Sequence, residues 1–190
     1  MRDFPDDPAP WTVLSSEYLV KKFWHTVRVE RVALPTGAII AEYFVTEFLP
    51  WVNVLAVTPD DEVVLIRQYR HGLGQVGFEL PAGTTEAGET SLEAAARREL
   101  LEETGYGGGR WSPFMTLSAN PALQNNLAHT FLAEGVVPTA AAHPEAGEDL
   151  RVHVVPIGEL EALLDEGGVV QALHAAPLAR FLLRLNRRGR

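Results

Sequence analysis

Short runs of apolar and β-branched residues recur along the first half of the chain, and turn-forming residues separate one run from the next. Runs of this length and composition are typical of strands. They occupy residues 11–20, 24–34, 38–48, 51–58, 63–70 and 76–83. The links "PTGA" and "PDDE" contain residues that favour turns, and the second link predicts a hairpin. The pattern therefore predicts a strand-rich first half that ends near Pro81 and Gly83.

A helical pattern first becomes convincing at residues 91–104, where "LEAAARRELLEE" is rich in strong helix formers. Ser91 or Thr90 can cap the start of this helix, and the glycines of "GYGGG" end it. Strand-like runs return at 111–119, 127–137 and 150–157, and helical patterns follow at 158–168 and 171–185. Many strands around a central helix, with a further helix at the end, predict an α+β or α/β sandwich.

The composition limits the possible functions. The 190 residues, 46 % of them hydrophobic, suit one packed domain with a small appendage. The net charge of −9 argues against a nucleic-acid partner, because nucleic acid requires a basic face. The chain has no cysteine, which excludes disulfides, zinc–thiolate sites and a cysteine nucleophile. There is neither an apolar signal region nor a run approaching the ~20 apolar residues of a membrane span, so we expect no membrane partner and a cytoplasmic location.

The helix predicted above carries three glutamates within one and a half turns. At about 100° per residue, Glu103 lies roughly +40° and Glu102 roughly −60° from Glu99. Leu92 falls on the same face, so the carboxylates point toward the body of the domain. Carboxylates gathered in this way repel one another and resist burial, and a divalent cation resolves both problems. The pattern indicates a site for Mg²⁺ or Mn²⁺, and a solvated glutamate-rich helix is the alternative.

The segment around these glutamates resembles the Nudix box, G-x5-E-x7-R-E-U-x-E-E-x-G-U, in which U is an aliphatic or bulky apolar residue. Gly83, followed after five residues by Glu89, matches its first part. The second part is matched by Arg98, Glu99, Leu100, Glu102, Glu103, Gly105 and Tyr106. Because so many positions are fixed, the resemblance is specific over residues 83–106 and looser over the rest of the chain.

One departure from the box lies between Glu89 and Arg98, where the chain has eight residues instead of seven. Inside a helix, an extra residue would rotate everything before it by about 100° or force a π-bulge. We expect this residue to be absorbed where the loop becomes helix, around Thr90 to Leu92. The block from Arg98 to Glu103 would then keep its register. The additional residue would instead shift the usual contact between Glu89 and the rest of the box.

The resemblance implies a Nudix fold, an α/β/α sandwich with a mixed central sheet, and hydrolysis of a nucleoside diphosphate linked to another moiety. It also implies Mg²⁺ (or Mn²⁺) as the cofactor. Glu99 and Glu103 are then the leading metal ligands, with Glu102 as a further ligand and a candidate catalytic residue. The backbone carbonyl of Ala82 often adds a ligand in this family.

The upstream segment "RQYRHGLGQVGFELPAG" resembles the ADP-ribose pyrophosphatase branch, in which a Q-Y/F-R segment precedes E-L/I-P-A-G. Arg70 is our candidate for binding the diphosphate because its fork matches phosphate oxygens; an arginine at a solvated strand edge is the alternative. Glu79 is expected to bind substrate or metal, unless it only forms an ion pair beneath the loop. Pro121, fifteen residues after Tyr106, matches the proline that marks this branch, although Ala122 replaces the usual glycine after it.

The acidic loop "HPEAGEDLRVHVV" resembles the loop that precedes the late strand in ADP-ribose pyrophosphatases. We expect Glu148 to act there as a further metal ligand or as the catalytic base, with Glu145 as the runner-up. Such loops can close on a substrate. The alternative is a solvated acidic loop without a catalytic role.

The chain is expected to comprise an N-terminal strand region, residues 1–46, and a Nudix hydrolase domain, residues 47–190. In the branch that it resembles, the N-terminal sheet commonly builds a homodimer, so we expect a dimer. The leading hypothesis is hydrolysis of ADP-ribose, or a related nucleoside diphosphate sugar, to AMP and a sugar phosphate. The alternatives are a GDP-sugar (GDP-mannose-type) pyrophosphatase and a non-catalytic Nudix-like ligand-binding module.

Overall fold

The computed structural model describes residues 6–22, 25–86, 89, 91–144 and 147–188. It divides into two compact units, one formed by residues 1–48 with 120–126 and the other by residues 49–119 with 127–190. Each unit is built on a sheet of its own. The segment that matches the Nudix box lies wholly within the second unit.

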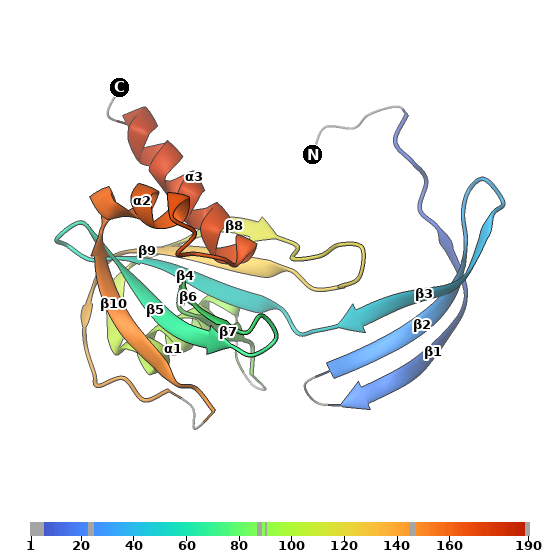
Figure 1. The fold of residues 1–190 in the computed structure, drawn as a ribbon, viewed down its shortest axis with the longest axis horizontal. Coiled ribbons are helices and arrows are strands. Elements are labelled where there is room, and N and C mark those ends of the chain that lie inside the picture. The colour runs from blue at the N-terminus through green and yellow to red at the C-terminus, as the bar shows by residue number, and fades with distance from the viewer. Residues whose placement is uncertain (1–5, 23–24, 87–88, 90, 145–146, 189–190) are drawn as a thin grey trace. The chain divides into compact units, whose positions relative to one another are not determined.

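The first unit is a three-stranded antiparallel sheet in the order β1-β2-β3 (Figure 1). Its strands are β1 (Thr12–Lys22), β2 (His25–Ala33) and β3 (Ile39–Glu47). The segment 120–126 joins this unit at β3, where the Thr46 amide donates to the Leu123 carbonyl at 2.7 Å. All residues of β1 are exposed, and several of them are large and apolar. The strand therefore presents an apolar surface.

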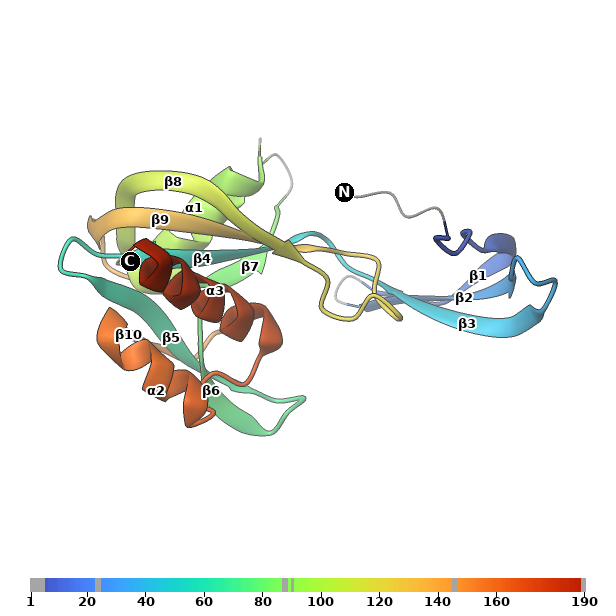
Figure 2. The ribbon, with the colours of Figure 1, turned by 90° about the horizontal axis from the view of Figure 1, so that it is seen from above.

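The second unit is built on a seven-stranded mixed sheet in the order β10-β5-β4-β9-β8, with β6 paired to β5 and β7 paired to β4. Its strands are β4 (Trp51–Val57), β5 (Glu62–Arg70), β6 (Gln75–Glu79), β7 (Ala82–Thr84), β8 (Tyr106–Leu117), β9 (Ala128–Pro138) and β10 (Leu150–Pro156). Strands β4 and β9 are parallel, and Figure 2 shows them side by side with β8. Strands β4 and β5 pair only beside their hairpin and then separate, β5 toward β6 and β4 toward β7. The β6–β7 connection lies at this split.

Helices cover both faces of the seven-stranded sheet, as Figure 1 shows. They are α1 (Leu92–Thr104) on one face, and the 3-10 helix η1 (Ile157–Glu159), α2 (Leu160–Asp165) and α3 (Ala172–Arg188) on the other. Strand side chains alternate between the two faces, so Ala56 and Val64 pack in the cluster under α1, whereas Leu55 and Leu65 pack in the cluster under α2 and α3. The predicted α+β fold, an α/β/α sandwich with a mixed sheet, is confirmed. In the described part of the chain, none of the helices has the length and apolar character needed to cross a membrane.

The strands differ from the sequence pattern at two places rich in proline or glycine. The run at 76–83 forms two strands, because Pro81 has no amide hydrogen for a ladder and the chain changes partner there from β5 to β4. Strand β8 begins at Tyr106, within the glycine segment that was expected only to end the helix. Gly109 has a φ of 70°, and a Cβ there would lie 2.7 Å from the Glu134 carbonyl oxygen, so glycine allows β8 to approach β9.

Candidate active site

Helix α1 fixes the register of the predicted ligands. At its start, the Ser91 hydroxyl accepts a hydrogen bond from the Ala94 amide at 3.1 Å, as predicted for a capping residue. At its end, Gly105 adopts a φ of 75° and its amide donates to the Leu101 carbonyl. The helix is uninterrupted over Leu92–Thr104, so the additional residue of the box does not form a π-bulge within it.

The face of α1 that packs on the sheet carries two of the three glutamates. Glu99 and Glu103 are buried on the same side as Ala95 and Ala96, which belong to the core. The Glu102 side chain lies at the edge of this face and is 31 % exposed. The inward orientation predicted from the helical wheel is therefore correct for Glu99 and Glu103, and partial for Glu102.

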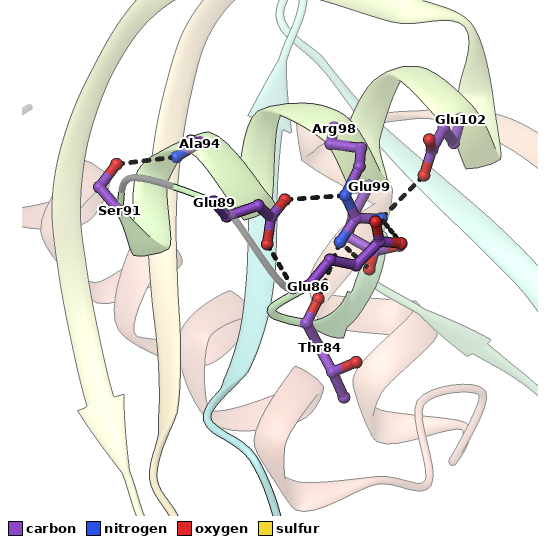
Figure 3. Close-up of polar contacts among 8 residues, drawn as sticks. All are labelled: Thr84, Glu86, Glu89, Ser91, Ala94, Arg98, Glu99 and Glu102. Carbon is purple, nitrogen blue, oxygen red and sulfur yellow. Dashed lines mark hydrogen bonds and ion pairs between the residues drawn. The ribbon is translucent and has the colours of Figure 1, made fainter.

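Arg98 lies at the centre of the glutamate cluster (Figure 3). Its Nε donates to Glu89 Oε1 and its Nη1 donates to Glu102 Oε2, both at 2.8 Å. Its Nη2 donates to the Thr84 carbonyl at 2.8 Å and lies 3.0 Å from Glu99 Oε1. One guanidinium thus ties the loop before the helix to the glutamates on the helix. Glu89 contacts the box despite the additional residue.

Strand β7 lies against the carboxyl groups of α1. The Ala82 amide donates to Glu103 Oε2 at 2.9 Å. A Cβ on residue 83 would lie 1.9 Å from Glu99 Oε1, so the backbone approaches this carboxylate only because Gly83 has no side chain. The position that opens the Nudix box therefore favours glycine in this chain, because a side chain there would collide with Glu99.

Burial makes the carboxylates of α1 difficult to ionise. Burial raises the pKa of Glu99 to about 7, with Arg98 opposing the shift and Glu148 adding to it. Burial also raises the pKa of Glu103 to about 9, and the charges of Glu99 and Glu148 add to that shift. A cation among these groups would relieve both the burial and the repulsion.

The acidic loop before β10 reaches the same cluster through Glu148. Its charge acts on Glu99 and Glu103, and it also acts on Arg70. The structure thus places Glu148 close enough to Glu99 and Glu103, the leading candidates for metal ligands, for its charge to act on them. Glu145, the predicted runner-up, lies outside the described residues.

The donors at α1 fit a divalent cation in their chemistry, although their side chains do not yet converge. Over the described residues, no three acidic, histidine or cysteine side chains form a group that could hold a metal ion. Glu99 and Glu102 turn toward Arg98, and Glu103 toward the Ala82 amide, so binding a cation requires side-chain rotation. The available donors are carboxylate oxygens, which suit Mg²⁺ and Mn²⁺. Burial raises the pKa of Glu99 and Glu103, so these two carboxyls hold their protons more tightly than exposed glutamates do.

These pKa values predict that alkaline pH destabilises the protein in a chelating buffer. A glutamate without such burial titrates near 4.5, whereas the pKa of Glu99 is about 7 and that of Glu103 about 9. Between pH 4.5 and its own pKa, each of these groups binds more protons in the folded chain than in the unfolded chain, so the free energy of unfolding falls as the pH rises through that range. The Tm should therefore fall between pH 5.5 and 8.5. Glu103→Gln should flatten the profile, and parallel profiles for the two proteins would contradict this expectation.

Arg70 and Glu79 form a two-bond ion pair where β5 and β6 lie beside each other. Arg70 Nε lies 2.8 Å from Glu79 Oε1, and Nη2 lies 2.6 Å from Oε2. The Glu79 side chain is 4 % exposed, whereas that of Arg70 is 49 % exposed. Burial opposes the Glu79 charge, but hydrogen bonds from Arg70 and His174 outweigh it and lower the pKa of Glu79 to about 2. Arg70 also lines a cavity of about 260 Å³, so its guanidinium is accessible to an anion.

Two further residues differ in how they relate to the sequence: Pro121 was predicted to contact the substrate, whereas no motif marks His174. Pro121 lies on the segment 120–126, which belongs to the first unit, and its contact with substrate stays a prediction. His174, on α3, has no histidine spacing around it that would mark a site, yet it is buried and its Nε2 lies 3.3 Å from Glu79 Oε2. No spacing motif could have found it, because 94 residues separate it from Leu80, its other partner.

Comparison with known proteins gives two family matches. Residues 48–174 match the NUDIX domain, and residues 11–46 match the nucleoside diphosphate sugar hydrolase N-terminal domain. The chain is 28 % identical over 165 residues to an ADP-ribose pyrophosphatase of Mycobacterium tuberculosis, covering 86 % of this chain and 79 % of that protein. It is 33 % identical over 135 residues to an ADP-ribose pyrophosphatase of Bacillus subtilis, covering 71 % of each.

A solved structure described as an ADP compounds hydrolase shares the fold. It aligns with a TM-score of 0.81 and 24 % sequence identity, covering 97 % of each chain. The NUDIX match spans more than half of the present chain and includes α1 with Glu99, Glu102 and Glu103. The chain therefore belongs to the Nudix hydrolase family, as the residues of its box predicted.

Proposed function

We propose that this Nudix hydrolase cleaves the diphosphate bond of ADP-ribose or a related nucleoside diphosphate sugar. The products from ADP-ribose would be AMP and ribose 5-phosphate. The observation that carries the proposal is the carboxyl cluster of α1, whose oxygens suit a divalent cation, within electrostatic range of the half-exposed guanidinium of Arg70. A diphosphate needs both, because its anionic oxygens must be neutralised before water can attack. The names of the two ADP-ribose pyrophosphatases that cover most of this chain support the substrate class.

Nudix hydrolases generally need a divalent metal, and we propose Mg²⁺ here, with Mn²⁺ as the alternative. The residues that would hold it are Glu99, Glu102 and Glu103, together with the backbone carbonyl of Ala82, and Glu148 would be a further ligand where it does not act as the base. When bound, the cation would neutralise phosphate charge and lower the pKa of the attacking water. The oxygen donors of this set match the preference of either ion.

The chain's own residues would bind the diphosphate, orient the metal ligands and deprotonate the attacking water. Arg70 would hold the diphosphate with the Nη1–Nη2 edge of its guanidinium, while Glu79 keeps the guanidinium oriented through Nε and Nη2. Glu148 would take the proton of the attacking water, and its place on a loop would allow it to approach the substrate. Arg98 would orient the glutamates of the box. Pro121 stays a candidate for shaping the substrate site.

Replacing Gly83 by Ala should disturb the Glu99 carboxylate more than the fold. The atoms that an added Cβ meets are the end of a flexible side chain, which can rotate away. Because that rotation misplaces a metal ligand, we expect hydrolysis to fall by about tenfold or more, while Tm changes by only a few degrees. The matched control is Gly158→Ala, since a Cβ there meets nothing within 4 Å. Equal rates for the two variants would contradict the role given to Gly83.

Product analysis tests the substrate class. ADP-ribose and GDP-mannose are incubated separately with Mg²⁺, with and without excess chelator, and the nucleotides are separated by chromatography. We expect AMP from ADP-ribose, and no release in the chelator. Faster release of GMP from GDP-mannose would favour the alternative GDP-sugar pyrophosphatase. Binding of these sugars without cleavage would contradict the proposal and favour a ligand-binding module.

We also propose that the first unit forms a homodimer and that the protein acts in the cytoplasm. Strand β1 exposes Leu14, Tyr18 and Leu19, and exposed apolar surface of this kind marks protein interfaces. Light scattering should give twice the 20.8 kDa of one chain, and Leu19→Glu should lower that mass toward one chain. A wild-type mass of one chain at micromolar concentration would contradict the dimer.

A further inference from the structure

Buried contacts link the first turn of α3 to Arg70, and they begin at His174. His174 is only 2 % exposed. Its Nδ1 accepts a hydrogen bond from the Leu80 amide at 3.3 Å. A ring nitrogen that accepts carries no proton, so the neutral ring has its proton on Nε2. That nitrogen lies 3.3 Å from Glu79 Oε2, and the hydrogen bond between the two groups helps to lower the pKa of Glu79.

Glu79 transmits this contact to Arg70. Both oxygens of Glu79 accept from Arg70, and Oε2 also accepts from His174. A carboxylate buried to this extent needs several donors to hold its charge in one orientation. Since a two-bond pair between carboxylate and guanidinium is planar, the plane of the Glu79 carboxylate sets the plane of the Arg70 fork.

The position of His174 is set by the core and not by Arg70. Asn53, buried on β4, donates from Nδ2 to the Leu173 carbonyl at 3.1 Å and so holds the start of α3. Val170 and Gln171, just before α3, line the cavity that Arg70 and Glu79 also line. The start of α3 therefore supplies both part of the cavity wall and the donor that orients its charged group.

We propose that His174 is a positioning residue for diphosphate binding, which it supports by holding Glu79 so that Glu79 holds the Arg70 fork. The inference rests on the proposed function in taking Arg70 as the group that binds the diphosphate. His174 itself need not touch the substrate, because both of its ring nitrogens are occupied by Leu80 and Glu79.

Two variants of His174 separate this role from simple packing. His174→Asn keeps an acceptor near the Leu80 amide but does not reach Glu79. His174→Gln reaches Glu79 with its amide nitrogen and so restores the donor. ADP affinity, measured by calorimetry with Mg²⁺ present, should fall about tenfold in H174N and recover in H174Q. Arg70→Gln should weaken ADP binding as well, and adding H174N to it should cause little further loss.

Loss of stability alone would give a different result. Leu178→Ala removes a fully buried apolar side chain from the core cluster on α3, and leucine has no polar atom to take part in the link from His174 to Arg70. It should lower Tm at least as much as H174N while leaving ADP affinity unchanged. If H174N does not fold, Glu79→Gln provides the second test, because it breaks the same link at its middle and should weaken ADP binding similarly.

The outcomes separate the inference from the proposed function. Three results would overturn the role of His174. H174N could bind ADP as tightly as wild type, or the loss in H174N could add fully to the loss in R70Q. The third such result is a wild-type protein that does not bind ADP. Failure of wild type to cleave any nucleoside diphosphate sugar would overturn the proposed function, while the ADP titrations would still test His174. If wild type cleaves ADP-ribose, H174N should raise KM by about tenfold with little change in kcat.

Discussion

Glu103→Gln should lower kcat for ADP-ribose hydrolysis by about 10³-fold, because a catalytic metal supplies several kcal/mol of transition-state stabilisation. Glutamine keeps the shape of the side chain, and its carbonyl oxygen can still accept from the Ala82 amide. It carries no charge, however, and a neutral amide is a weaker ligand for Mg²⁺ than a carboxylate. The rate of AMP release at saturating ADP-ribose and Mg²⁺ measures the effect.

The same substitution should spare the fold, which separates a lost ligand from a lost structure. Burial raises the pKa of Glu103 to about 9, so the folded chain resists its charge and should tolerate the amide. The Tm of the variant in chelator should equal or exceed that of wild type. Glu93→Gln is the control, because Glu93 lies on the same helix but forms an exposed pair with Arg97. An E103Q variant that retains more than about a tenth of the wild-type rate would contradict a metal role for Glu103.

Arg98→Lys should weaken the apparent affinity for Mg²⁺ by roughly 10- to 100-fold, although it conserves the charge. The three guanidinium nitrogens contact Glu89, Glu102 and the Thr84 carbonyl at the same time. A lysine ammonium is a single point charge and cannot span these groups. The glutamates would lose their common anchor. The measurement is the Mg²⁺ concentration that gives half-maximal hydrolysis.

Arg97→Lys is the matched control for this effect. Arg97 is the neighbouring residue on α1, and it pairs with Glu93 at 2.9 Å and lies over the Trp111 ring at 4.4 Å. Its contacts lie away from the carboxylate cluster, so its half-maximal Mg²⁺ concentration should stay near wild type. If R98K and R97K need the same Mg²⁺ concentration, Arg98 does not organise the metal ligands.

The sequence was sufficient to predict those features of the site that depend on residues close together in the chain. Glu99, Glu102 and Glu103 share a helix, so their spacing alone fixes which face they occupy, and the structure buries two of them as expected. The glycine that opens the box also has a local cause, since it lies against Glu99. The order of strand-like runs and helical patterns, together with the family resemblance, was sufficient for the layered sandwich, in which each face of the sheet has its own helices.

The features that depend on distant contacts could not be predicted. His174 reaches Glu79 because α3 returns to the sheet, and nothing in the residues around it marks that return. The contact of Arg98 with the Thr84 carbonyl depends on the path of a loop rather than on a residue type. The division of residues 76–83 into two strands depends on which neighbour each half finds in the sheet. Such pairings come from tertiary structure, which local pattern does not encode.

The most direct test of the central claim is a calorimetric titration of Mg²⁺ into the chelator-treated protein, free of nucleotide. Wild type and Glu93→Gln should bind Mg²⁺ with the same affinity, whereas Glu103→Gln should bind it about tenfold more weakly or not at all. Equal binding by E103Q and wild type would show that the cation does not lie at the carboxylates of α1, and would contradict the proposed role of the glutamate helix.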